Sequence, residues 1–375
     1  MGLLMDHESY MRQALELARR GRGRVEPNPM VGAVVVRDGE VVGRGWHDRV
    51  GEAHAEVAAI EDAGGSGRVA GASMYVTLEP CNHQGRTPPC TEALIEARLR
   101  RVVIATVDPE PRVAGAGVRR LQEAGVDVTV GVCQAEARQL NEAFIKRVTT
   151  GLPWVILKWA QTLDGKTATA SGDSQWISGE ASRRTVHELR GRVDAVMVGI
   201  GTVLADDPQL TARDVTVHRK ARRVVVDARL RTPASARLAQ EDPASLTLAV
   251  SEGLVQQEDA RVGQWRERGV EVMGLPTLGG GELDLEPLLR HLVEAHEATN
   301  VLVEGGSLLA GSMLAQGWVD QVLAYVAPRV VGDAAAIDAV RGLACPTIAE
   351  AVTLRLRQVR RIDEDVLLDY RVASG

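Results

Sequence analysis

Two stretches, "HAEVAAIEDAG" at residues 54–64 and "EPCNHQGRTPPC" at residues 79–90, decide how the first part of this chain folds. The first has the composition of a helix. The second joins the strand-like "ASMYVTLEP" to the helix-like "CTEALIEARLR", which Cys90 would open. Strands that alternate with helices in this way predict a layered α/β domain.

The flanking sequence extends the same pattern. Upstream, an amphipathic helix is expected to carry Met11, Ala14, Leu15 and Ala18 on one face, followed by a hairpin that turns at residues 38–39. Downstream, the pattern predicts elements in this order: a strand at 100–108, a helix at 115–126, a strand at 127–132 and one helix at 135–148.

The stretch "TTGLPW" at 149–154 breaks the helical pattern and marks the expected boundary between domains 1–150 and 151–375. The second half is also α/β, with strands such as 194–203 and 300–306 and helices such as 180–192 and 307–315. Two domains suit the length of 375 residues.

Composition and charge exclude several classes of protein. The net charge is −6 with no basic stripe, so no nucleic-acid partner is expected. There is no signal-peptide pattern and no long apolar run, so we expect a cytoplasmic protein without membrane contact. Four cysteines in such a chain favour metal binding or catalysis over disulfides. Cys133 and Cys345 lack such a context and are expected to be ordinary core residues.

Residues His54, Cys81 and Cys90 offer the nitrogen and sulfur ligands that zinc prefers, with a fourth position open for water. Glu56 lies too close in sequence to His54 to be the fourth ligand. It is placed to take a proton from water and return it to a leaving amine. This arrangement is typical of zinc nucleobase deaminases. In those enzymes two residues commonly stand between the two cysteines, whereas eight residues stand between Cys81 and Cys90.

That long insert is informative, because "LEPCNHQGRTPPC" with the upstream "HAE" and "PNPMVGAVVV" resembles the deaminase half of the bifunctional riboflavin-biosynthesis deaminase/reductase family. The resemblance covers about residues 5–148 and implies a cytidine-deaminase-like α/β/α fold. It places Asn28, His47, His83 and Arg86 on substrate-binding positions. A guanidinium at Arg86 suits a phosphate, whereas Asn28 between two prolines is also typical of a simple turn.

The second half resembles the reductase half of the same family over about residues 152–372, chiefly in "TLDGK", "SQWI", "TVLADDPQLT" and "VEGG". The resemblance implies a dihydrofolate-reductase-like fold and an NADPH cofactor. It places substrate contacts at Lys158, Ser174, Arg190, Leu210, Arg213 and Glu304. It places cofactor contacts at Ala160, Trp176, Thr202, Asp206, Gly306 and Ser307. Residues 214–298 receive no site.

Some of these positions also make sense from the residues alone. A glycine-rich strand end that feeds a helix at 307 favours an anion, although such a pair is often only a tight turn. The stretch "GIGTVL" lacks the third glycine of a dinucleotide fingerprint. Arg190 and Arg213 are potential phosphate partners or solvated side chains. Lys158 within an apolar strand needs a partner or a cavity.

The resemblance implies zinc-dependent deamination of a phosphorylated diaminopyrimidinone ribosylamine, followed by NADPH reduction of its ribosyl chain. Relatives are oligomeric, so a homo-oligomer is expected. Two alternatives remain open at this stage. One is a deaminase of nucleosides or tRNA, and the other is a degenerate module with a structural zinc, which would have no use for Glu56.

Overall fold

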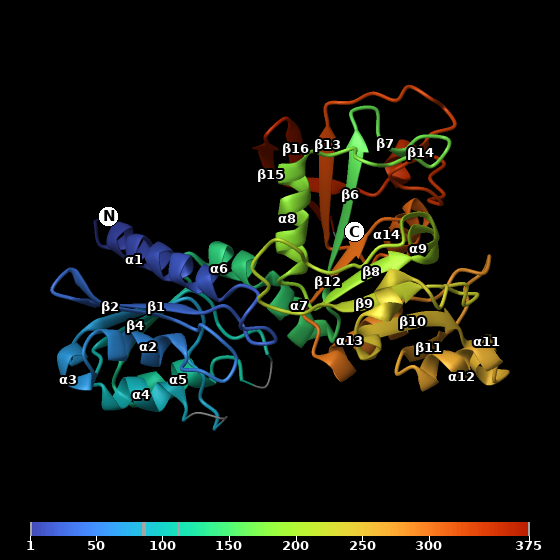
Figure 1. The fold of residues 1–375 in the computed structure, drawn as a ribbon. Helices are drawn as coiled ribbons and strands as arrows, with labels where there is room; N and C mark the ends of the chain where they lie inside the picture. Colours follow the sequence, from blue (N-terminus) through green and yellow to red (C-terminus); the bar gives the residue numbers. More distant parts are fainter. Residues whose placement is uncertain (1, 85–87, 111–112, 374–375) are drawn as a thin grey trace. The chain divides into compact units, whose positions relative to one another are not determined.

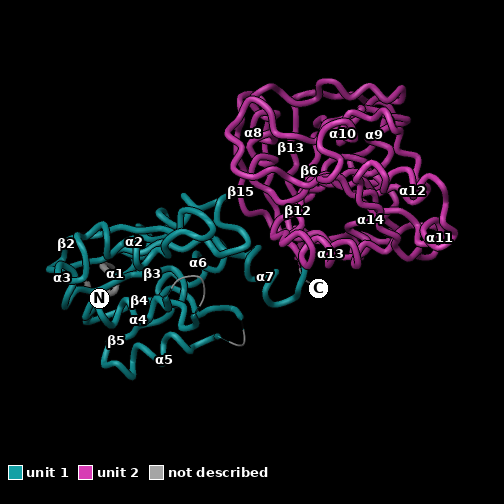
Figure 2. The backbone as a smooth tube through the Cα atoms, turned by 60° about the horizontal axis from the view of Figure 1, so that its bottom comes forward, with its two compact units in different colours: residues 1–152 teal, residues 153–375 magenta. Residues whose placement is uncertain are grey.

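A computed structural model describes residues 2–84, 88–110 and 113–373. The chain divides into two compact units, Met1–Leu152 and Pro153–Gly375 (Figure 2). Each unit has its own hydrophobic core. Within the described ranges, no helix combines the length and apolarity that crossing a bilayer requires. The expectation of two α/β domains is confirmed.

The first unit is built around a five-stranded sheet of order β2-β1-β3-β4-β5. Its elements are α1 (Gly2–Ala18), β1 (Gly32–Arg37), β2 (Glu40–Trp46), α2 (Ala55–Asp62), α3 (Ser66–Val69), β3 (Ser73–Val76), α4 (Cys90–Glu96), β4 (Arg101–Ile104), α5 (Ala116–Glu123), β5 (Asp127–Val130), α6 (Gln134–Leu140) and α7 (Glu142–Thr150).

Alternation along the strands sorts side chains onto the two faces of this sheet, which makes three layers (Figure 1). On β1, Val34 and Val36 pack with α1 and α6, whereas Ala33 and Val35 pack with α2, α4 and α5. The expected apolar face of α1 is buried. The hairpin between β1 and β2 turns at residues 38–39, as predicted.

The helix expected at 135–148 is wrong as a single element, because the structure ends α6 at Leu140 and begins α7 at Glu142. Asn141 between them is buried, and its side chain forms two hydrogen bonds with the backbone of Met30. Its Oδ1 accepts from the Met30 amide at 2.8 Å, and its Nδ2 donates to the Met30 carbonyl at 2.9 Å. A tertiary contact therefore interrupts a sequence of helical composition.

The second unit contains a nine-stranded sheet of order β11-β10-β9-β8-β12-β6-β13-β16-β15 and a two-stranded sheet of β14 and β7. Its elements are β6 (Trp154–Thr162), β7 (Lys166–Ala168), α8 (Glu180–Arg190), β8 (Ala195–Gly199), α9 (Ile200–Asp206), β9 (Arg222–Val226), α10 (Arg237–Gln240), β10 (Leu246–Ser251), α11 (Glu252–Gln256), α12 (Ala260–Glu267), β11 (Glu271–Leu275), α13 (Glu286–His296), β12 (Asn300–Glu304), α14 (Ser307–Ala315), β13 (Gln321–Ala327), β14 (Ile337–Asp338), β15 (Leu354–Ile362) and β16 (Asp365–Val372).

The strands from β11 to β13 pair in parallel, and β16 and β15 extend the sheet antiparallel. The order places β8, β12 and β6 side by side, although they are far apart in sequence. Ligands of open parallel sheets bind beyond the carboxyl ends of the strands where the order reverses. Central strand ends are therefore where a site is expected.

Two local expectations for this unit are corrected. The strand expected at 194–203 ends at Gly199, where the short helix α9 begins. Cys345, expected in the core, is exposed. By contrast, the strand 300–304 leads through two glycines into α14 as the sequence predicted.

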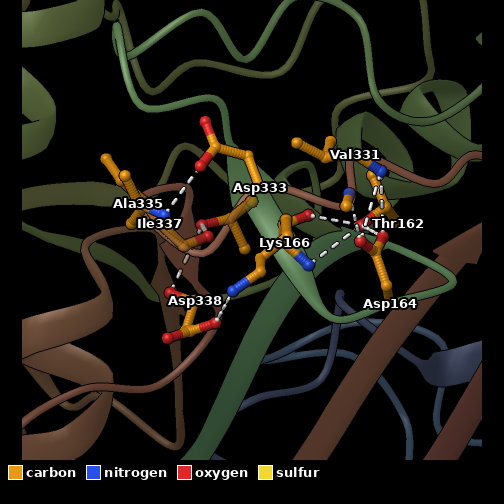
Figure 3. A network of polar contacts seen from close by, with 10 residues as sticks. Thr162, Asp164, Lys166, Val331, Asp333, Ala335, Ile337 and Asp338 are labelled. Atoms are coloured by element: carbon orange, nitrogen blue, oxygen red, sulfur yellow. Dashed lines mark hydrogen bonds and ion pairs between the residues drawn. The ribbon is translucent and has the colours of Figure 1, made fainter.

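The "TLDGK" stretch forms the turn between β6 and β7 and fastens a distant segment (Figure 3). Asp164 accepts hydrogen bonds from the Thr162 hydroxyl at 2.6 Å and from the backbone amides of Val331 and Gly332. The Lys166 ammonium pairs with Asp338 on β14 at 2.6 Å. These residues therefore build the scaffold around β6.

Candidate active sites

The first unit brings the three expected metal ligands together at two helix starts and one loop. His54 is the residue before α2, Cys90 is the first residue of α4, and Cys81 follows Pro80 in the segment after β3. Cys90 is buried, and Cys81 is half-buried. The sheet brings the two helices to one place, since α2 and α4 pack on the same face.

The spacing of the three ligand atoms fits zinc. His54 Nδ1 lies 3.1 Å from Cys90 Sγ and 3.6 Å from Cys81 Sγ, and the three atoms lie within 4.8 Å of one another. A tetrahedral zinc with its usual bond lengths separates sulfur and nitrogen ligands by about 3.5 Å. Hydrogen bonds from Cys90 and His54 lower the pKa of the Cys81 thiol, which favours the thiolate that zinc binds.

Glu56 lies in the first turn of α2 and is only 3% exposed. A side-chain hydrogen bond links its carboxyl to Cys90, and burial raises its pKa. A buried carboxyl beside the metal ligands is suited to accept and return a proton near neutral pH. Its position two residues after His54 puts both groups at the same end of α2.

Two of the expected substrate residues lie next to these ligands. The His47 ring is buried and makes an edge contact with the His54 ring, with 5.5 Å between their centroids. Asn28 Nδ2 is 3.1 Å from His47 Nε2, and His47 Nδ1 is 3.2 Å from the Ala53 carbonyl. Burial lowers the pKa of His47, which favours the neutral ring. His83 is exposed, and Arg86 lies outside the described residues.

Glu79 was missed by the sequence reasoning. Its buried carboxylate accepts four backbone N–H groups from the segment after β4 and from the first turn of α5. These amides belong to Asp108, Gly115, Gly117 and Val118, at 2.8–3.2 Å. Glu79 therefore ties this segment to the chain two residues before Cys81. An acidic residue just before the Pro-Cys pair was the signal available in the sequence.

The second unit brings Lys158, Arg190 and Glu304 into one buried charge cluster. Lys158 on β6 pairs in register with Glu304 at the end of β12, and its ammonium is 3.9 Å from the Glu304 carboxylate. Arg190, at the end of α8, donates to both Glu304 oxygens at 2.5 and 2.9 Å. Burial lowers the pKa of Lys158. The Arg190 fork is engaged by protein, which leaves Arg213 as the more accessible guanidinium.

The cofactor positions Thr202, Gly306 and Ser307 also meet. Gly305 and Gly306 have positive φ angles of 72° and 82° and form the turn before α14. A Cβ at Gly305 would lie 3.2 Å from the Thr202 hydroxyl on α9. Such a turn leaves the first amides of α14 and a hydroxyl available to an anion, which suits the pyrophosphate of NADPH.

The remaining expected residues are more scattered. The Trp176 side chain is 60% exposed, with the Arg183 guanidinium 4.5 Å from its ring centre. The Leu210 side chain is buried in the core. Half-buried residues are Ala160 on β6 and Ser174; exposed residues are Asp206 at the end of α9 and Arg213.

Two further residues border the charge cluster and were not singled out from the sequence. His187 on α8 accepts a hydrogen bond from the Arg213 amide at 3.2 Å. The Tyr325 ring on β13 lies 5.7 Å from the Lys158 ammonium, and its hydroxyl is 2.9 Å from Thr185. His187 is three residues before Arg190, a spacing that shares a helix face. Tyr325 gave no signal because its neighbours come from pairing of β13 with β6.

Comparison with known proteins accounts for both halves. Residues 4–106 match the cytidine and deoxycytidylate deaminase zinc-binding region, and residues 153–368 match the RibD C-terminal domain. The riboflavin biosynthesis protein RibD of Aquifex aeolicus is 40% identical over 97% of this chain and 98% of its own. The chain belongs to the RibD family. The Escherichia coli RibD is 42% identical over 97% of this chain and 99% of its own.

Solved RibD structures share the fold over the full length. Acinetobacter baumannii RibD superposes with a TM-score of 0.85 at 38% identity, covering 99% of both chains. A Thermotoga maritima diaminohydroxyphosphoribosylaminopyrimidine deaminase/5-amino-6-(5-phosphoribosylamino)uracil reductase does so with 0.85 at 37% identity, again covering 99% of each. This member of the family is therefore a bifunctional enzyme of riboflavin biosynthesis that combines a zinc-dependent deaminase half with an NADPH-dependent reductase half.

Proposed function

We propose that this enzyme first deaminates 2,5-diamino-6-(5-phosphoribosylamino)pyrimidin-4-one. It then reduces the ribosyl chain of the product with NADPH, to give 5-amino-6-(5-phosphoribitylamino)uracil. The observation that carries the first step is the meeting of His54, Cys81 and Cys90 beside the buried Glu56. The full-length likeness to RibD proteins favours this substrate over a nucleoside or tRNA.

In the deaminase half, His54 Nδ1 and the thiolates of Cys81 and Cys90 would hold zinc. When bound, zinc supplies the Lewis acidity that makes water nucleophilic near neutral pH. Glu56 takes the two protons of the attacking water in turn and gives one to the ring nitrogen beside the reacting carbon and one to the leaving nitrogen. The C–N bond breaks, a carbonyl replaces it, and ammonia leaves. Asn28 and His47 form the wall next to His54 and orient the pyrimidine, while His83 and Arg86 serve its phosphoribosyl end.

In the reductase half, the glycine turn at Gly306, with Ser307 and Thr202, holds the pyrophosphate of NADPH. Lys158 and Glu304 face the pyrimidine, and Arg213 serves the phosphate. Arg190 keeps the Glu304 carboxylate ionised and aligned through its two hydrogen bonds. The remaining proposed contacts are Ser174 and Leu210 for the substrate, and Ala160, Trp176 and Asp206 for the cofactor.

We also propose a cytoplasmic homo-oligomer as the working form. All four cysteines are free, and one of them, Cys345, is exposed. Free exposed thiols suit a reducing compartment. Sedimentation of the purified chain tests the oligomeric state, and a monomer at working concentrations would contradict it.

A two-signal assay tests the function. Purified protein receives the phosphorylated diaminopyrimidine and NADPH under anaerobic conditions, while ammonia release and NADPH absorbance are followed separately. We expect ammonia first and NADPH oxidation second, with both lost on Cys81→Ser or zinc chelation. Supplying the deaminated product should restore NADPH oxidation in Cys81→Ser. A folded, zinc-loaded protein that gives neither signal, but deaminates cytidine, would overturn the proposal.

A further inference from the structure

A second group of metal-ligating side chains lies in the reductase unit, at the edge of the sheet where β9, β10 and β11 begin. Glu271 is the first residue of β11, and His291 and His296 both lie on α13. Their ligand atoms are within 4.8 Å of one another. The charge cluster of Lys158 and Glu304 lies instead at the carboxyl end of β12.

Both imidazoles turn the same atom toward one carboxylate. His291 Nε2 lies 2.7 Å from Glu271 Oε1, and His296 Nε2 lies 3.2 Å from Glu271 Oε2. The two rings meet edge to face with 5.3 Å between their centroids. All three side chains are about a quarter to a third exposed (23–31%), so water and a cation can reach them.

Hydrogen bonds from two neighbouring side chains fix the Glu271 carboxylate. Glu271 Oε2 accepts the Thr247 hydroxyl at 2.7 Å and the Arg222 guanidinium at 3.3 Å. Oε1 is bonded by His291, and no second partner contacts it among the residues that the structure describes. Metal-bound carboxylates are typically fixed by outer hydrogen bonds of this kind. Oε1 is therefore the oxygen available to a metal.

The protonation states also suit metal binding. Burial alone would raise the pKa of Glu271, but hydrogen bonds from Thr247 and His291 outweigh it and lower the pKa to about 2. Burial and the nearby Arg222 charge lower the pKa of His296. Metals bind the ionised carboxylate and the neutral imidazole, and both shifts favour these forms.

We propose that Glu271, His291 and His296 bind a divalent transition-metal cation such as Zn²⁺. Glu271 Oε1 and the two Nε2 atoms are its ligands, and water completes the coordination. Two imidazoles and one carboxylate suit Zn²⁺, Co²⁺ and Ni²⁺. Nitrogen and oxygen ligands of tetrahedral zinc lie about 3.4 Å apart, so the 2.7 Å between His291 Nε2 and Glu271 Oε1 requires only a small outward movement. On binding, each ring keeps one proton on Nδ1.

The cation would join the start of β11 to the end of α13. It binds the folded state alone, because the three residues are brought together by the fold. A free cation concentration one hundred times its dissociation constant would therefore shift the folding equilibrium of this unit about 100-fold toward the folded state. The role is to stabilise the edge of the sheet, and no step of either reaction depends on it.

Metal counting on the untagged full chain tests this assignment. Protein with its deaminase site loaded is equilibrated with excess Zn²⁺, and bound zinc is measured per chain by elemental mass spectrometry. We expect two ions per chain in the wild type and one in His291→Gln and in His296→Gln. His218→Gln, which replaces an exposed histidine elsewhere in the unit, should keep two.

Substitution with Co²⁺ identifies which site is lost. A thiolate-to-cobalt absorption band marks the Cys81–Cys90 site and should persist in His291→Gln, together with full deamination. One ion per wild-type chain, or two ions in both histidine variants, would overturn the proposal. If the wild type binds two ions but does not deaminate the diaminopyrimidine, the function proposed for the first unit fails and the metal site stands. The two failures are therefore distinguishable.

Discussion

The two catalytic regions are assembled in different ways. The deaminase ligands fall within residues 54–90 and sit on two helix starts and the loop between them. The reductase cluster draws Lys158, Arg190 and Glu304 from β6, α8 and β12. The sheet order pairs β6 with β12, and a side-chain contact adds Arg190 from α8. In the first unit a single change should therefore remove chemistry and leave the fold intact. In the second unit a single change should affect both the chemistry and the stability of the fold.

The largest effect is expected for Glu56→Gln. Positioned general acid–base groups contribute about 10²–10⁴-fold to rate, so ammonia release should fall by at least that range. The amide keeps the volume of the carboxyl, so thermal unfolding should change little. Reduction of supplied deaminated product should be unchanged. Glu52→Gln, an exposed neighbour, is the matched control. Full deamination by Glu56→Gln would remove the proton-transfer role.

Glu304→Gln tests the expectation that one change in the second unit affects both the reduction and the stability of the fold. The change leaves two buried cations, Lys158 and Arg190, without their counter-charge. Breaking a buried pair in this way typically costs about 3–5 kcal/mol. We expect NADPH oxidation to be lost and the second unit to unfold at lower urea, while deamination continues.

The exposed Glu294 provides the control, as Glu294→Gln should change neither property. If Glu304→Gln lost reduction with no shift in the urea midpoint, Glu304 would act only on the ligand. The supposed dependence of the reductase fold on its charge cluster would then be wrong.

Asn28→Ala should have a moderate effect on the first site. It removes the group that lies 3.1 Å from His47 Nε2. A neutral hydrogen bond is worth about 1 kcal/mol, or roughly fivefold in binding. We expect KM for the pyrimidine to rise by that factor with kcat nearly unchanged. A fall in kcat alone would show that Asn28 acts in the transition state.

The smallest effect concerns acid stability at the turn shown in Figure 3. Hydrogen bonds from Thr162 and Gly332 lower the pKa of Asp164 from 3.8 to about 2. The unfolded chain therefore binds more protons than the folded chain in that window. The stabilisation by Asp164 is complete above pH 3.8 and is lost as pH falls through about 2.

The Asp164→Asn variant has no carboxylate at this position and therefore lacks this pH-dependent stabilisation. The difference between wild type and variant in urea denaturation should be constant near neutrality and shrink between pH 4 and pH 2. A difference that does not change over this range would show that the carboxylate charge is not what fastens residues 331–332.

How far the sequence predicts the structure differs in the same way between the units. Local signals placed both helix starts of the zinc site and the hairpin at residues 38–39, because composition and turn chemistry are short-range. The break at Asn141 and the role of Tyr325 depend on partners more than 100 residues away. Periodicity contains no such information. Lys158 stood out as a lysine in an apolar strand, whereas Glu304 was reached only through family resemblance, and Glu79 was passed over because its partners are backbone amides.

Glu79 also has a consequence for local motion. The amide hydrogens of Asp108, Gly115, Gly117 and Val118 all end on one carboxylate. Asp108 and Gly115 lie outside helices and strands, and Gly117 and Val118 lie in the first turn of α5, where amides have no partner within the helix. All four should nevertheless exchange with deuterium slowly and at a common rate. Freeing one amide leaves three others holding the same acceptor, so opening requires the whole set to separate together. The chain leading to Cys81 would thus belong to a single cooperative opening unit.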